Sequence, residues 1–95
     1  LTDDREKQTY LQKYFDAAAK TVELYPGLGR LRMTLAGAAE SLGKKDIALI
    51  NYKKAVEIEE AYRKQFKIMY PDRELFSRLG RDNYQLAKQK ISQSQ

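Results

Sequence analysis

Apolar residues recur at alternating spacings of four and three along this chain, and three short breaks interrupt the pattern. The first stretch shows the rule in Leu11, Phe15, Ala18, Val22 and Tyr25. This period is that of one face of an α-helix, and no stretch alternates as a half-buried strand does. The sequence therefore predicts an all-α chain of four helices joined by short loops. The breaks are Pro26-Gly27 with Gly29, Gly43-Lys44-Lys45, and Tyr70-Pro71-Asp72.

The breaks set the bounds of the predicted helices within a single domain that spans residues 1–95. Gly43 suits the left-handed position just after the second helix. Asp46 and Asp72 are good N-caps for the third and fourth helices. Gly37 lies inside the second helix, where it costs about 1 kcal/mol against Ala, so we expect a neighbour to pack closely there. The predicted helices are 3–25, 28–42, 46–69 and 72–92.

The residue types that are missing narrow the chemistry. The 95 residues include neither Cys nor His, which excludes disulfides, thiol nucleophiles, the usual zinc sites and the commonest general base. We expect no enzyme activity, no cofactor, no metal and no small-molecule substrate. No apolar run approaches the roughly 18 residues of a membrane span. The chain begins with Leu1 rather than Met, so we expect a processed chain, for example an exported one, or a fragment.

Small and aromatic residues in 28–60 follow a recognisable order. Leu35 and Ala36 lie in the first helix of this stretch, Gly43 lies at the turn, and Ala48, Tyr52 and Ala55 lie in the second helix. In this order the stretch resembles one tetratricopeptide repeat, a helix-turn-helix unit of 34 residues. The resemblance implies that these six residues pack the repeat. It departs from the family pattern at Arg32, Ala39 and Glu60, and at Glu60 the second helix continues to about residue 69.

The flanking segments resemble half repeats. Residues 3–25 look like the second helix of a repeat without its first, with Ala18 in the place of Tyr52. Residues 72–92 look like a first helix without its second, because Phe76, Leu79, Gly80 and Asn83 follow the spacing of that helix. The resemblance implies a right-handed stack of four antiparallel helices that is open at both ends.

Open ends of this kind suggest head-to-tail self-association into a homo-oligomer, a ring or a filament. The net charge of +5 is uneven: residues 1–59 carry +1 and residues 60–95 carry +4. Acidic residues near the start, such as Asp3 and Asp4, would face basic residues near the end, such as Arg78 and Arg81. The residues expected at this interface are Leu11, Phe15, Ala17, Ala18 and Ala19 on one side, and Phe76, Leu79, Gly80 and Asn83 on the other.

Four other hypotheses remain open. The chain is a fragment of a longer repeat array, or a compact unit whose last helix folds back as a polar cap. The resemblance also suggests a docking module that binds an acidic peptide of a foreign partner in a groove lined by Arg30, Arg32 and Thr34. A final hypothesis is nucleic-acid binding by the basic and aromatic residues of the last third. Partner and compartment are not specified by the sequence.

Overall fold

The structure is a computed structural model that describes residues 2–94, and the side chains of residues 3–94. Its helices are α1 (Thr2–Leu24), α2 (Gly29–Ser41), α3 (Lys45–Met69) and α4 (Arg81–Gln93). No strand occurs within residues 2–94, so the prediction of an all-α chain with four helices is confirmed. The first three helices begin and end within two residues of their predicted bounds.

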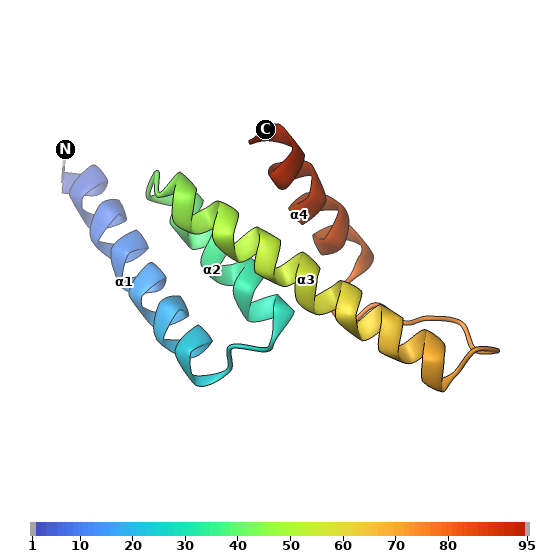
Figure 1. Ribbon diagram of the computed structural model, residues 1–95. Helices are drawn as coiled ribbons and strands as arrows, with labels where there is room; N and C mark the ends of the chain where they lie inside the picture. The colour runs from blue at the N-terminus through green and yellow to red at the C-terminus, as the bar shows by residue number, and fades with distance from the viewer. Residues whose placement is uncertain (1, 95) are drawn as a thin grey trace.

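The helices form an elongated array of 57 × 30 × 18 Å. α2 and α3 form an antiparallel hairpin, α1 packs against α2, and α4 packs against α3 (Figure 1). Gly43 makes the sharp turn between α2 and α3 at a φ of 73°, as predicted. Its N–H bonds to Glu40 O at 2.9 Å, and the N–H of Lys44 bonds to Ala39 O at 2.8 Å. These two bonds form a Schellman motif, which satisfies the last carbonyls of α2.

Small residues dominate the core. Because alanine side chains are short, α2, α3 and α4 approach one another closely, and Tyr52 fills the space that remains. A second, smaller cluster joins α1 to α2 through Ala18, Val22 and Leu35. The main cluster consists of Ala36, Ala39, Ala48, Tyr52 and Ala87.

The prediction of a helix over residues 72–92 is wrong in its first part. Residues 70–80, here named the return segment, run back along α3 without helical structure, and α4 begins only at Arg81. The residue before α4 is Gly80, whose φ of 96° favours glycine. Asp72 is therefore not an N-cap. Neither is Asp46, which lies in the first turn of α3 behind Lys44.

Contacts with α3 and α2 explain the path of the return segment. The buried carboxylate of Glu59 accepts hydrogen bonds from Ser77 Oγ at 2.5 Å and from the backbone N–H of Leu79 at 3.1 Å. Arg30 Nε donates to the carbonyl of Arg78 at 2.9 Å. Leu79 is buried, whereas the last turns of α3 extend beyond the other helices (Figure 1). A long-range cluster thus determines where α4 begins.

Candidate association surface

α1 carries two apolar stripes side by side. Its buried stripe faces α2 with Ala18 and Val22 at its centre. The second stripe, one position earlier, has the same alternation of four and three, and we name it the α1 seam. Tyr10 and Leu24 in this seam are 66% and 68% exposed, and the rings of Tyr10 and Tyr14 stack at 6.4 Å. The α1 seam consists of Tyr10, Tyr14, Ala17, Thr21 and Leu24.

A shallow groove lies between the α1 seam and α2. Gly37 contributes to its floor, and a Cβ atom built on Gly37 would meet no atom within 4 Å. Within residues 2–94, no neighbour packs closely on Gly37, so the prediction of close packing there is wrong for a single copy of the chain. The groove is therefore open above Gly37. The groove is lined by Tyr10, Leu11, Tyr14, Met33, Thr34, Gly37, Ala38 and Ser41.

Most residues predicted for the first half of the interface pack inside the chain. Phe15, Ala18 and Ala19 belong to the apolar contacts between α1 and α2. Leu11 is half-buried beside them at the edge of the groove. Only Ala17 is exposed, and it lies in the α1 seam. The outward surface of α1 is thus the neighbouring stripe, not the stripe that the sequence analysis selected.

The residues predicted for the second half do not form a helix face. Leu79 is buried and Gly80 precedes α4. Asn83 donates from its side-chain amide to Leu79 O at 3.0 Å, and Phe76 is exposed in the return segment. Among the described residues of α4, Leu86 is the one large apolar side chain that is exposed. The free face of α4 is therefore polar.

The remaining predicted residues have structural contacts. Leu35, Ala36, Ala48, Tyr52 and Ala55 are all buried, and their assignment to a repeat stays a prediction. The guanidinium of Arg32 donates to Pro26 O at 3.1 Å and to Asn51 Oδ1 at 3.1 Å. Arg30 bonds to the return segment, and Thr34 alone of the predicted peptide groove lines the α1–α2 groove.

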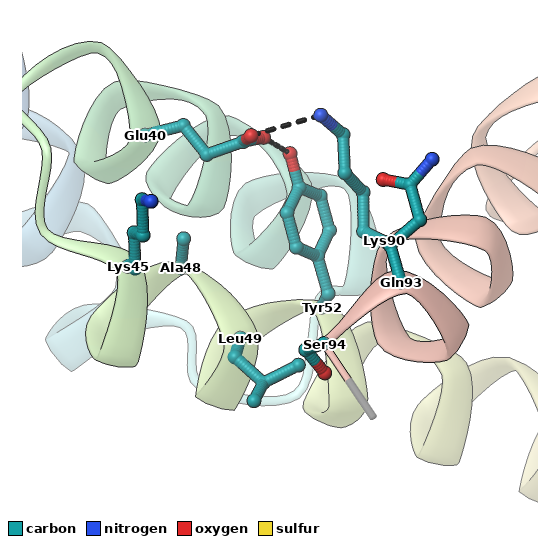
Figure 2. A pocket seen from close by; sticks show the side chains of 8 residues that line it. All are labelled: Glu40, Lys45, Ala48, Leu49, Tyr52, Lys90, Gln93 and Ser94. Carbon is teal, nitrogen blue, oxygen red and sulfur yellow. Dashed lines mark hydrogen bonds and ion pairs between the residues drawn. The ribbon is translucent and has the colours of Figure 1, made fainter.

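A cleft on the other side of α2 is spanned by polar contacts between helices (Figure 2). Glu40 of α2 accepts a hydrogen bond from the Tyr52 hydroxyl and pairs with Lys90 Nζ at 2.8 Å. The bonds from Lys90 and Tyr52 lower the pKa of Glu40, while burial and the bond to Glu40 raise the pKa of Tyr52. Because these groups satisfy one another, the cleft ties α4 to the α2–α3 hairpin.

Glu59 of α3 has a comparable role, because it holds the return segment against α3. Burial alone would raise the pKa of its carboxyl group, which is 1% exposed. Hydrogen bonds from Ser77, Arg63 and the Leu79 N–H outweigh burial and lower that pKa. This role of Glu59 was not predicted from the sequence.

Three residues of the α1 seam were not predicted from the sequence: Tyr14, Thr21 and Leu24. The available signal was their alternating spacing, which repeats that of the buried stripe.

Within residues 2–94, no helix combines the length and apolarity that a bilayer crossing requires. The same residues hold no cluster of acidic side chains placed to bind a metal ion. Comparison of this chain with family models, curated proteins and solved structures finds no match.

Proposed function

We propose that this chain is a protein-association module that pairs with a second copy of itself through the α1 seam. The observation that carries the proposal is the exposed second stripe of α1 beside an open groove in α2. An exposed apolar surface of this kind marks a contact site on a small protein. The polar free face of α4 offers no matching surface, so the proposed contact joins the same face of both copies.

The α1 seam is complementary to itself in shape. Its large residues, Tyr10 and Tyr14, precede its small residues, Ala17 and Thr21. When two seams run antiparallel, Tyr14 of each copy lies over Ala17 of the other, and Tyr10 lies over Thr21. Alternating large and small side chains across facing helices allow close packing. The helix of the second copy also lies against Gly37, where the missing side chain gives it room.

Charge opposes this pairing only weakly. Lys13 and Lys20 border the α1 seam on its solvent side, and antiparallel pairing brings Lys13 near Lys20 of the second copy. Like charges on exposed helix surfaces cost about 0.2–0.5 kcal/mol per pair. Full burial of one large apolar side chain contributes about 1.5–3 kcal/mol, and Tyr10 and Tyr14, which are 66% and 45% exposed, can each contribute part of that. Because each copy buries two tyrosines, the apolar contribution is the larger one.

In the proposed dimer, α1 of one copy meets α1 of the other. In head-to-tail assembly, the last helix of one copy would meet the first helix of the next. Residues 72–80 are not helical, so the helical half repeat predicted for the end of the chain is shorter than expected. The resemblance to tetratricopeptide repeats supports the proposal in one respect: a helix preceding α1 in a repeat would lie in the α1–α2 groove. In the proposed dimer, α1 of the second copy takes that place.

A cross-linking experiment tests the proposal. Because the natural chain has no Cys, Ala17→Cys introduces a single thiol into the α1 seam, and a short bismaleimide should join two chains rapidly. The matched control is Ala61→Cys, which places a thiol on the exposed surface of α3. Cross-linking of Ala17→Cys no faster than that of the control would refute the dimer. A foreign helix would then be the remaining occupant of the groove.

A further inference from the structure

The far end of α3 presents an apolar tip that no other helix covers. Ile68 and Met69 are 69% and 56% exposed, and Tyr70 and Pro71 beside them are also exposed. Figure 1 shows that these last turns project beyond α1, α2 and α4. We name residues 68–71 the α3 tip. It is separate from the α1 seam, which lies on another helix at the opposite side of α2.

Basic residues surround the α3 tip. Lys64, Lys67 and Arg73 are exposed, and Asp72 and Glu74 are the acidic residues next to them in the chain. Residues 61–76 contain four basic and two acidic side chains, Arg63 being the fourth cation, so this stretch carries a net charge of +2. Arg73 lies over the ring of Tyr70 at 5.3 Å, which holds one cation directly at the tip. A cleft beneath it is lined by Arg63, Phe66, Lys67, Tyr70, Pro71, Arg73 and Leu75.

The combination of side chains distinguishes among anionic partners. Single-stranded nucleic acid would require free aromatic rings on which bases stack. The exposed aromatic ring of the tip, that of Tyr70, lies under Arg73, whereas the more exposed side chains, Ile68 and Met69, are aliphatic. A lipid surface accepts aliphatic side chains at the level of the headgroups, and its phosphates attract lysine and arginine. We propose that the α3 tip docks on an anionic phospholipid bilayer, where Ile68 and Met69 enter the interface and Lys64, Lys67 and Arg73 meet the headgroups.

Vesicle co-sedimentation of the full chain tests this inference. Phosphatidylcholine vesicles with and without phosphatidylserine serve as the probes. We expect at least tenfold stronger binding to the vesicles that contain phosphatidylserine, and weaker binding at high salt. The double variant Lys64→Gln/Lys67→Gln should lose about tenfold or more of that binding, since each cation near such a surface contributes about fivefold.

The apolar contribution has a matched control on the same helix. Ile68→Ser/Met69→Ser should lower binding about tenfold or more. Ile50→Ser removes a side chain that is 59% exposed on the same face of α3, five turns before Ile68, and should leave binding within about twofold of the natural chain. Circular dichroism of each variant checks that the helices persist.

Three results would overturn the inference. One is equal binding to vesicles with and without phosphatidylserine. Another is an Ile50→Ser variant that loses as much binding as Ile68→Ser/Met69→Ser. The third is binding to a single-stranded oligonucleotide or to polyglutamate with no detectable binding to vesicles, which would assign the cations to a soluble polyanion.

Discussion

The backbone N–H of Leu79 donates a hydrogen bond of 3.1 Å to the carboxylate of Glu59, twenty residues earlier in the chain. This bond positions the buried side chain of Leu79 one residue before Gly80, which precedes α4. The Leu79 N–H is thus bonded to a side chain and not, as in an α-helix, to the carbonyl four residues earlier. The contact between these two residues therefore fixes the end of the return segment against α3, just before α4 begins at Arg81.

Substitution of Glu59 should destabilise the fold. Glu59→Gln keeps the size of the side chain but removes the charge that Arg63 Nε meets at 2.8 Å. We expect a loss of about 1–3 kcal/mol in the free energy of unfolding, measured by urea denaturation. Glu57→Gln is the matched control, because the Glu57 side chain is largely exposed and pairs with Lys54 only at 3.7 Å. A loss as small as that of the control, within about 0.5 kcal/mol, would contradict the role of Glu59.

Acid should weaken the fold through the same carboxyl groups. The pKa values of Glu59 and Glu40 lie below their ordinary value of 4.5 in the folded chain. As pH falls through 4.5, the unfolded chain takes up protons before the folded chain does, so the free energy of unfolding decreases. Urea midpoints should therefore fall steadily from about pH 5 downward. Glu59→Gln should flatten this dependence and Glu57→Gln should not; an equally steep dependence in both would be the opposite result.

Gly37 separates the stability of the chain from its association. Gly37→Ala should raise the free energy of unfolding of the monomer by about 0.5–1 kcal/mol, since a Cβ atom there meets nothing within 4 Å. Gly37→Leu should keep the fold yet fill the groove and weaken dimerisation at least tenfold. Thermal unfolding at low concentration and analytical ultracentrifugation measure the two effects. Normal dimerisation of Gly37→Leu would exclude the groove from the contact.

Salt distinguishes a second copy from an acidic partner. The proposed dimer brings Lys13 of each copy near Lys20 of the other along the solvent side of the seam, so screening should strengthen it about two- to threefold between low and high salt. An acidic helix bound in the same groove would be released by salt. Dissociation constants measured across a salt series decide between these outcomes.

The sequence predicted the first three helices closely because one strong apolar stripe runs through each of them. It did not predict the start of α4, because the N-cap preference of Asp72 is local, whereas the return segment is held by Glu59 and by Arg30, which lies 48 residues from Arg78. A match between two segments of the sequence does indicate where α4 begins relative to α2. The tripeptides Leu28-Gly29-Arg30 at the start of α2 and Leu79-Gly80-Arg81 at the start of α4 are identical, and Leu35-Ala36 and Leu86-Ala87 follow each at the same distance.

The candidate site was harder to predict than the helices. Both stripes of α1 have helical spacing, and only the structure shows that Ala18 and Val22 face α2 while Tyr10 and Leu24 face outward. The sequence analysis selected the stripe with Leu11 and Phe15, which is the more apolar one and is therefore the one used in the core. Ala17 alone belongs to both the predicted interface and the α1 seam.

The central claim is that two copies pair through the α1 seam, and sedimentation velocity over a wide concentration range tests it most directly. If two copies pair in this way, the mass should shift from 11.0 kDa to twice that value with rising concentration. Ala17→Glu places a charge in the seam and should remain a monomer throughout, while the control Ala61→Glu should dimerise like the natural chain. A natural chain that stays monomeric at every concentration, or an Ala17→Glu variant that dimerises unchanged, would contradict the account.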